Sequence, residues 1–337
     1  MTALTNHRIL LAAHPDGRPV PSDFRLERLP APEPAEGELL LEILYLSLDP
    51  YMRTRMNAGA TYAETVPLGA VMLGATVARV KRSRHPGWRD GEIVLSYSGW
   101  QQYALSDGSG LRRLDPALAP VSSALGVLGM TGFTAWVGLE EIGKPQPGET
   151  VVVAAASGAV GSVVGQIARL RGARVVGIAG GAAKCAWIRD ELGFDAVVDH
   201  RAPDFADRLR QACPQGIDVY FENVGGAVLE AVKPLLNEFA RIPVCGLIAQ
   251  YNDPAADAAI SLSDILFKSL TVRGFIQTDF VERYQDAFLA QGAQWIKDGV
   301  LRWREDVVDG LENAPEAFIG LLEGKNFGKL VVRVAAV

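Results

Sequence analysis

The sequence predicts an α/β fold with two domains, a doubly wound parallel sheet and a smaller β-rich domain. From Thr150 onward, apolar strand segments alternate with helical segments, which is typical of a parallel sheet covered by helices. Before about residue 125, short β-type runs are separated by turns rich in Pro and Gly, which indicates a compact, barrel-like domain. We expect the β-rich domain to cover 1–127, completed by about 303–337, and the parallel sheet to lie within 128–302.

The expected strands follow from short apolar and β-branched runs. In the β-rich part they lie at 39–45, 75–80 and 91–96. In the parallel sheet they lie at 151–156, 174–179, 196–199, 217–222, 241–246 and 271–275. A last apolar run, Leu330–Val334, is expected to return to the first domain as a strand.

The composition narrows the function classes. The chain has 337 residues, 49% hydrophobic and 21% charged, which is typical of a globular protein with two buried cores. Its net charge of −6 and the lack of a basic run argue against nucleic acid as a partner. No apolar segment reaches membrane-spanning length and the N-terminus lacks a signal-peptide pattern, so we expect a cytoplasmic protein with no membrane partner.

A strand, a glycine turn and a helix follow one another from Val151 to Arg171. Within the turn, Ala156-x-Gly158-x-x-Gly161 is the dinucleotide-binding pattern with its first glycine replaced by alanine. Gly158 allows close approach to a pyrophosphate, and Gly161 allows the helix to pack on its strand. The unpaired N–H groups at the start of the helix favour the phosphate charge. The alternative is an ordinary helix start rich in alanine and glycine, and the strand before it makes the dinucleotide site the better interpretation.

The next strand indicates which dinucleotide binds. An NAD site carries an acid about 20 residues past the pattern, but here no acid occurs before Asp190. Lys184, assisted by His200 or Arg201, can instead bind a 2′-phosphate, so the sequence favours NADP. The alternative for Lys184 is a solvated lysine at a helix start, where a cation opposes the helix dipole.

Several motifs occur together and in order along nearly the whole chain. They are Asp49–Arg53, Gly129–Gly132, Ala155–Gly161, Glu222–Gly226, Cys245–Asn252 and Gly324–Lys329. With them, the chain resembles the zinc-independent double-bond reductases of the medium-chain dehydrogenase/reductase superfamily. That group includes the leukotriene/prostaglandin reductases, the plant alkenal reductases and the bacterial NADPH-dependent curcumin reductases. The resemblance implies a GroES-like barrel domain joined to a Rossmann domain.

The zinc-binding branch of that superfamily has ligands that this sequence lacks. No cysteine precedes Cys185, and none of the four histidines lies in a Gly-His-Glu motif. The three cysteines, Cys185, Cys213 and Cys245, match neither a zinc cluster nor a disulfide framework, and we expect them to be small buried residues. We therefore expect no metal site.

The resemblance implies NADPH-dependent transfer of hydride to the β-carbon of an α,β-unsaturated ketone or aldehyde. It implies cofactor contacts from Gly158, Ala159, Val160, Gly161, Lys184, His200, Asn223, Cys245, Gly246, Tyr251, Phe275 and Asn326. His200 departs from the tyrosine of many relatives and would make cofactor affinity sensitive to pH. The alternative is a surface histidine at a strand end.

Tyr251 and Tyr51 are the catalytic candidates. Tyr251 follows the C-terminal end of a strand, the edge at which ligands bind in open α/β sheets. Its phenol could donate a hydrogen bond to an enolate oxygen or relay a proton, and the alternative is an amphipathic wall of the cleft. Tyr51 is expected more as a lining residue of the substrate pocket.

Other residues near the expected cleft are implied by the same resemblance. Met130 and Thr131 should lie near the nicotinamide and line the substrate pocket, and Thr131 replaces a proline that is common there. Arg53 is expected to pair with Asp49, the other interpretation being a pocket cation. Asn326 is expected at the cleft between the domains.

Relatives form homodimers by extending the Rossmann sheet, so Val244 and the strand at 271–275 are expected to pair across a two-fold axis. Two other functions are left open. An NADPH:quinone oxidoreductase would use the same hydride donor with a flatter pocket, and a protein that only binds NADPH would have lost catalysis. The motifs around Tyr51 and Tyr251 argue against both.

Overall fold

The computed structural model describes residues 4–59, 63–253, 255–256 and 258–336. The chain divides into two compact units. The first comprises the described parts of Met1–Leu125, Glu305–Asn326 and Leu330–Val337. The second comprises the described parts of Gly126–Arg304 and Phe327–Lys329.

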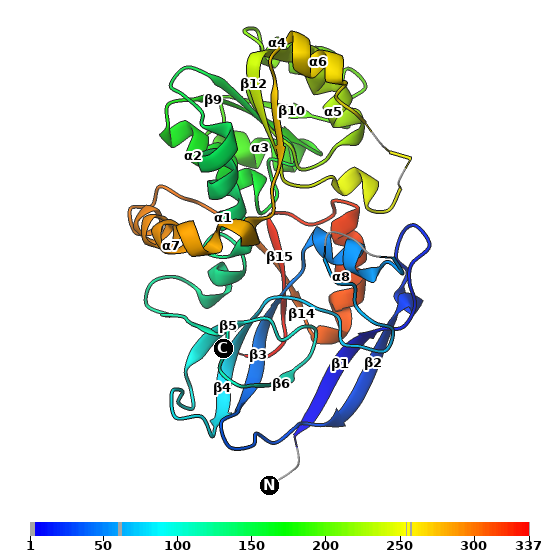
Figure 1. Ribbon diagram of the computed structural model, residues 1–337, viewed down its shortest axis with the longest axis vertical. Coiled ribbons are helices and arrows are strands. Elements are labelled where there is room, and N and C mark those ends of the chain that lie inside the picture. The colour runs from blue at the N-terminus through cyan, green and yellow to red at the C-terminus, as the bar shows by residue number, and fades with distance from the viewer. Residues whose placement is uncertain (1–3, 60–62, 254, 257, 337) are drawn as a thin grey trace. The chain divides into compact units, whose positions relative to one another are not determined.

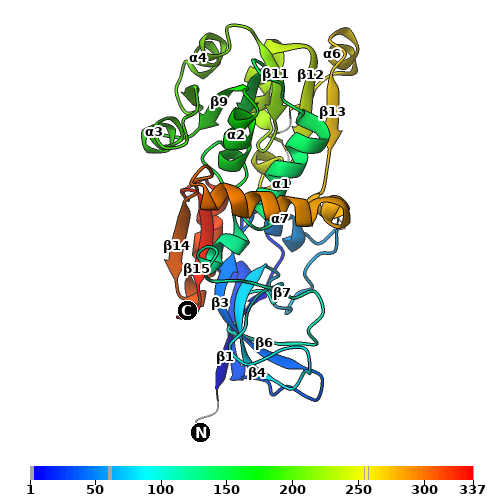
Figure 2. The same cartoon turned by 90° about the vertical axis from the view of Figure 1, so that its left-hand side faces the viewer.

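The first unit is built on a sheet whose described strands follow the order β14-β15-β3-β4-β5-β7, with β6 also paired to β3 (Figure 1). These strands are β3 (Leu39–Ser47), β4 (Thr76–Ser83), β5 (Ile93–Ser96), β6 (Tyr103–Ser106), β7 (Arg112–Arg113), β14 (Glu305–Asp309) and β15 (Lys329–Arg333). A separate antiparallel pair consists of β1 (Thr5–Leu11) and β2 (Phe24–Pro30). Figure 2 shows β14 and β15 side by side.

Strand β3 is the centre of this unit. Its run of leucine and isoleucine is buried almost throughout, because the strand pairs antiparallel with β4, β6 and β15 and apolar side chains cover both of its faces. The return strand predicted at Leu330–Val334 is present as β15, which pairs with the C-terminal end of β3. The β-rich character predicted for this part of the chain is therefore confirmed.

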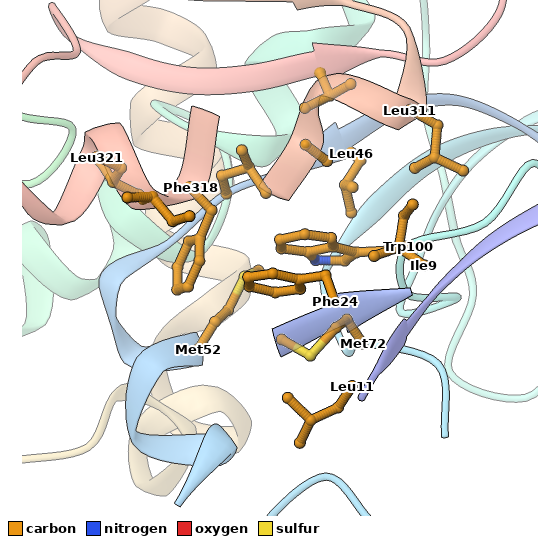
Figure 3. Close-up of a cluster of buried hydrophobic side chains, with 14 of the residues drawn as sticks. Ile9, Leu11, Phe24, Leu46, Met52, Met72, Trp100, Leu311, Phe318 and Leu321 are labelled. Atoms are coloured by element: carbon orange, nitrogen blue, oxygen red, sulfur yellow. The ribbon is translucent and has the colours of Figure 1, made fainter. Parts of the chain in front are cut away.

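An aromatic cluster forms one core of the first unit (Figure 3). The Phe24 ring stacks on Trp100 with centroids 5.6 Å apart, and Phe318 meets Trp100 edge to face at 5.7 Å. Phe318 comes from α8 (Ala314–Leu322), so the C-terminal part of the chain helps to build this core. Met52, from the helical turn Pro50–Met56, also packs here, which anchors the segment that carries Tyr51.

The second unit contains a six-stranded parallel sheet in the order β10-β9-β8-β11-β12-β13 (Figure 1). Its strands are β8 (Thr150–Val153), β9 (Arg174–Ala179), β10 (Ala196–Asp199), β11 (Ile217–Phe221), β12 (Leu236–Val244) and β13 (Thr271–Gly274). The chain proceeds outward from β8 through β9 to β10, then crosses over to β11. The carboxyl ends of β8 and β11 therefore flank the switch point at which such sheets bind ligands. This is the predicted Rossmann architecture.

Helices cover the parallel sheet. They are α1 (Met130–Val137), α2 (Gly161–Leu170), α3 (Ala182–Asp190), α4 (Phe205–Ala212), α5 (Gly226–Val232), α6 (Leu262–Phe267) and α7 (Val281–Lys297). The core beneath α4 and α5 joins strand residues such as Val152, Ile178 and Tyr220 to Leu209 and Leu229. Tyr220 is fully buried there, although its side chain is polar.

Most of the predicted strands differ in extent from the observed ones, and two of these differences lie at the candidate site. The strand predicted at 151–156 ends at Val153, and Ala155 adopts a positive φ of 51°. The chain turns sharply here because α2 must begin at Gly161 and pack directly against the turn. The strand predicted at 241–246 is β12, which starts earlier, at Leu236, and ends at Val244, where the chain leaves the sheet to form a loop.

Candidate functional site

The glycine turn between β8 and α2 fits a dinucleotide pyrophosphate. A Cβ on Gly161 would lie 2.4 Å from the carbonyl oxygen of Ala155, so no larger residue fits without a shift of the backbone. A Cβ on Gly158 would lie 3.2 Å from the same oxygen. Ala159 and Val160 complete the turn and are half-buried. The first N–H groups of α2 are therefore held at the switch point, where they can bind phosphate oxygens.

Three basic side chains meet beside the carboxyl end of β9. A Cβ on Gly180 would lie 2.7 Å from His200 Nε2 and 2.9 Å from Arg201 Nε, so both side chains lie against the β9–α3 turn. Lys184 projects from the first turn of α3. The Arg201 amide donates a hydrogen bond to Asp199 Oδ1 at 2.9 Å, which holds the β10 end in place. The cluster suits a phosphate dianion.

The charges of this cluster act on His200. Burial by the surrounding protein lowers the pKa of the imidazole, and the positive charges of Arg201 and Lys184 lower it further. The carboxylate of Asp199 opposes them. The side chain is nevertheless exposed at the surface, so a bound anion can reach it. His200 is thus neutral at a lower pH than an ordinary histidine until an anion binds.

A second group of residues surrounds the carboxyl end of β11. Asn223 Nδ2 donates to the carbonyl oxygen of Ala154 at 2.8 Å, which ties the loop after β11 to the loop after β8. Glu222 Oε1 accepts from the amides of Val224 at 2.7 Å and Gly225 at 2.8 Å. The side chain of Asn223 is therefore placed by bonds on both sides of it.

The loop after β12 is tied to the same point. The amides of Cys245 and Gly246 donate to the carbonyl oxygen of Glu222 at 2.9 and 3.3 Å. Burial and the negative charge of Glu222 raise the pKa of the Cys245 thiol to about 12, so it stays protonated at neutral pH. The predicted contact residues Asn223, Cys245 and Gly246 thus lie together.

Tyr251 belongs to this group. It follows the helical turn Ile248–Gln250 and is half-buried. A Cβ on Gly246 would lie 3.2 Å from the Tyr251 hydroxyl, so the phenol lies over the backbone of Gly246. The phenol is thereby placed next to the loops after β11 and β12.

Met130, Thr131 and Phe275 lie elsewhere in the second unit. The buried Thr131 hydroxyl donates to the carbonyl oxygen of Gly126 at 3.0 Å, so its proton is committed to the backbone. Met130 is the first residue of α1 and is half-buried. The Phe275 ring is buried and meets Phe221 edge to face at 6.3 Å. A contact from Phe275 to a cofactor would therefore come from its backbone.

Tyr51 lies in the first unit. It is half-buried and packs against the aromatic core, and its carbonyl oxygen accepts from the Thr54 hydroxyl at 2.8 Å. Arg53 donates to the carbonyl oxygen of Gly17 at 2.7 Å and to Asn57 Oδ1 at 2.5 Å. Burial lowers the Arg53 pKa, and the nearby carboxylate of Asp23 raises it. The expected Arg53 ion pair and the pocket role of Tyr51 stay predictions.

Asn326 is the last residue of its segment of the first unit and is half-buried. The next residues belong to the second unit, where Gly328 forms a β-bridge with Gly158 of the glycine turn. The Phe327 ring meets Trp187 of α3 edge to face at 5.4 Å. The cofactor contact expected of Asn326 stays a prediction.

Glu222 and Tyr220 are the residues that the sequence did not single out. Glu222 is 1% exposed and Tyr220 is fully buried. The available signal was an acid at the end of an apolar strand, directly before Asn223 and a Gly-Gly pair. An acid so placed must find its hydrogen bonds inside the protein.

The predicted pairing of Val244 across a two-fold axis is wrong. Val244 lies on β12, where it pairs with Gly274 on one side and forms a bridge to Glu222 on the other. Both edges of the backbone are therefore already used within the sheet. Strand β13 is the edge strand beside β12 (Figure 2). Its residues Thr271–Gly274 are all exposed.

The described residues were also compared with the requirements of a metal site and of a membrane-spanning helix. In the described ranges, no three His, Cys, Asp or Glu side chains come together as a possible metal site. Every helix in those ranges is too short or too polar to span a lipid bilayer.

Comparison with known proteins assigns the chain to a family. Residues 7–114 match the family described as "N-terminal domain of oxidoreductase", and residues 159–291 match the family described as "Zinc-binding dehydrogenase". The chain is 52% identical to the NADPH-dependent curcumin reductase of Escherichia coli, over 98% of this chain and 97% of that protein. It is 40% identical to prostaglandin reductase 1 of Bos taurus, over 96% and 97% of the two chains.

A solved structure agrees with these relatives. The crystal structure of CurA from Vibrio vulnificus in complex with NADPH is 51% identical, with a TM-score of 0.94, and the match covers 98% of this chain and all of that one (100%). The glycine turn, the basic cluster and the relatives therefore agree on the cofactor, NADPH. The chain belongs to the zinc-independent, NADPH-dependent reductases of the medium-chain dehydrogenase/reductase superfamily.

Proposed function

We propose that this enzyme reduces the carbon–carbon double bond of α,β-unsaturated ketones and aldehydes with NADPH, including aryl enones of the curcumin type and enones of the prostaglandin type. The relatives named for curcumin and prostaglandin reduction support this substrate class. The observation that carries the proposal is the position of Tyr251. Its phenol lies over Gly246, beside Asn223, at the edge of the sheet where the reacting end of the cofactor is expected.

The chain's own residues hold the cofactor at three points. The turn from Gly158 to Gly161 offers helix N–H groups to the pyrophosphate. Lys184, His200 and Arg201 bind the 2′-phosphate by charge-assisted hydrogen bonds. Asn223 and the backbone of Cys245 and Gly246 orient the nicotinamide, with Phe275 and Asn326 adding contacts at the rim. When bound, NADPH supplies the hydride.

The substrate accepts a hydride at its β-carbon because the double bond is conjugated to the carbonyl group. Addition of hydride at the β-carbon moves the π electron pair toward the carbonyl, so negative charge collects on that oxygen as an enolate. The Tyr251 phenol donates a hydrogen bond to this oxygen, which stabilises charge that is absent from the ground state. A solvent-derived proton at the α-carbon then gives the saturated ketone. Met130 and Thr131 line the pocket in this proposal.

The test is NADPH oxidation with an alkenal, an aryl enone, curcumin and a quinone, followed by identification of the products. Turnover of the enones to products saturated at the α,β-bond is expected. Turnover of the quinone alone would favour the NADPH:quinone oxidoreductase instead. Tyr251→Phe should lower kcat on an enone about 10- to 100-fold, because one donor to the enolate oxygen is lost. An unchanged kcat would show that Tyr251 only lines the pocket.

We also propose that the enzyme is a cytoplasmic homodimer whose two copies pair through β13. All four residues of this edge strand are exposed, and the adjacent helix α6 exposes Leu262 (83%), Leu266 (73%) and Phe267 (77%). Leu266→Lys should convert the dimer to a monomer in sedimentation velocity, because a buried charge opposes association. A monomeric wild-type protein would contradict the dimer, and fractionation of cells tests the location.

A further inference from the structure

We propose that Glu222 is a positioning residue for the nicotinamide end of the cofactor, and that it acts through the hydrogen bonds of its buried carboxyl group. This inference rests on the proposed cofactor role of Asn223. Glu222 does not contact the reacting atoms in this account. It fixes the backbone that carries the residues that do.

The first support is the number of loops that meet at Glu222. Its side-chain Oε1 accepts two amides of the loop after β11, from Val224 and Gly225. Its carbonyl oxygen accepts two amides of the loop after β12, from Cys245 and Gly246. Asn223, next in the chain, adds the loop after β8 through the carbonyl oxygen of Ala154. Glu222 thus connects two of the loops at the switch point of the sheet, and its neighbour Asn223 connects the third.

The second support is the conformation that the carboxyl group holds. Gly225 has a φ of 75° and Gly226 a φ of 52°, and α5 begins at Gly226. Oε1 accepts the amides of Val224 and Gly225, the two residues that lead into Gly226 and the start of α5. Without this acceptor, two amides near the start of α5 would lose their partner inside the protein.

The surroundings of the other carboxyl oxygen, Glu222 Oε2, also support the proposal. Within the part of the chain that the structure describes, neither Glu222 Oε2 nor the Tyr220 hydroxyl has a hydrogen bond of standard geometry, and both are buried. Glu222 lies two positions after Tyr220, in a β-bridge that directly follows β11, so the two side chains point to the same face. After burial itself, Glu222 is the main cause that raises the Tyr220 pKa far above its usual value. The two groups therefore face each other inside the protein, where solvent does not reach them.

The surroundings indicate that hydrogen bonding, and not charge, is what Glu222 contributes. Burial is the largest influence on its pKa and raises it, while amide hydrogen bonds from Val224 and Gly225 lower it. A glutamine has the same shape. Its Oε1 would accept the same two amides, and its Nε2 would donate to the Tyr220 oxygen. A neutral side chain can therefore do everything that this geometry requires.

The test compares Glu222→Gln, Glu222→Ala and Glu222→Asp in the full-length enzyme. Two readouts do not require turnover: NADPH affinity from cofactor fluorescence, and amide hydrogen exchange of residues 223–226 without cofactor. Loss of a buried acceptor for two amides should weaken NADPH binding about tenfold or more in Glu222→Ala and accelerate exchange by a similar factor. Glu222→Gln should restore both to within about threefold. Tyr220→Phe should give a smaller change in the same direction.

Glu230→Ala is the matched control, because Glu230 is exposed on α5 and only pairs with Lys233, at 2.7 Å. It should leave both readouts unchanged. If Glu222→Ala does not fold, Glu222→Asp, which is one methylene shorter, still tests the claim. Wild-type affinity and exchange in that variant would contradict it. A Glu222→Gln enzyme as impaired as the alanine variant would show that the charge matters and would also contradict it.

Asn223→Ala separates the inference from the function on which it rests. If Asn223→Ala weakens NADPH binding while Glu222→Ala and Glu222→Asp do not, the cofactor site stands and the inference is wrong. If Asn223→Ala binds NADPH like the wild type, the proposed placement of the nicotinamide is itself wrong.

Discussion

The two ends of the proposed cofactor site are built differently. At the end that would hold the 2′-phosphate, Lys184 is half-buried and His200 and Arg201 are exposed, so recognition relies on charge. At the end that would hold the nicotinamide, the buried Glu222 and the half-buried Cys245 are joined in a network of backbone hydrogen bonds. In the proposed site, charge would select the cofactor where solvent has access. Fixed geometry would position it where hydride transfer requires that water be excluded.

The largest expected effect is the slow reaction of the Cys245 thiol, at the nicotinamide end, with an alkylating reagent. Its pKa of about 12, against an ordinary 9.0, leaves about a thousandfold less thiolate at pH 8. Alkylation of Cys245 by iodoacetamide in the folded enzyme should therefore be at least about a hundredfold slower than in the unfolded chain. Mass spectrometry of the peptide that contains Cys245 measures this. Equal rates in the folded and unfolded protein would show that this end of the site is open and polar.

A change in the turn between the two ends should have the next largest effect. In Gly161→Val the new Cβ meets the Ala155 carbonyl oxygen at 2.4 Å, so the start of α2 must move. Strain of about 1–3 kcal/mol should weaken NADPH binding roughly 10- to 100-fold and lower Tm. Gly320→Ala is the control, because its Cβ meets only Lys325 at an ordinary 3.5 Å. Tight NADPH binding by Gly161→Val would place the pyrophosphate elsewhere.

Removal of one cation should test the 2′-phosphate end by itself. Lys184→Ala should weaken NADPH binding about tenfold and leave NADH binding unchanged, because a charge-assisted hydrogen bond to the phosphate is lost. Titration of both cofactors by fluorescence measures the ratio. Lys233→Ala, a surface lysine on the same unit, should change neither. An unchanged preference in Lys184→Ala would assign specificity to His200 and Arg201 alone.

The smallest expected effect is a dependence on pH. In the free enzyme the pKa of His200 lies below its ordinary 6.5, chiefly because of burial and the nearby Arg201. A bound phosphate dianion raises that pKa, so binding takes up a proton. NADPH affinity should therefore fall a few-fold as pH rises from the free pKa to the bound pKa, and NADH affinity should not. His200→Gln should remove most of this slope. Equal slopes for the two cofactors would contradict it.

Much of the parallel sheet could be predicted from the sequence. Strands β9 and β10 have the predicted bounds, 174–179 and 196–199, because each is a short, mainly apolar and β-branched run. The apolar run at 151–156 led to a strand that was predicted too long, because Ala154–Ala156 is apolar but belongs to the turn. Strand β2 was not predicted, because the charged residues Arg25, Glu27 and Arg28 interrupt its apolar residues.

Some residues of the candidate site could likewise be predicted from the sequence, and others could not. Gly158, Gly161 and Lys184 follow a local pattern, so a linear reading could find them. Glu222 depends on hydrogen bonds to loops that follow two different strands, β11 and β12, and no local pattern records which loops meet. The Val244 prediction failed for the same reason, because the neighbours of a strand in a sheet depend on the order of the whole sheet.

The most direct test of the central claim follows the transferred hydrogen. An aryl enone should be reduced with NADPH that carries deuterium at C4, and the product analysed by NMR. The account predicts deuterium at the β-carbon of a saturated ketone whose carbonyl is intact. Deuterium on the former carbonyl carbon, in an unsaturated alcohol, would show that the enzyme reduces the carbonyl and would contradict the account.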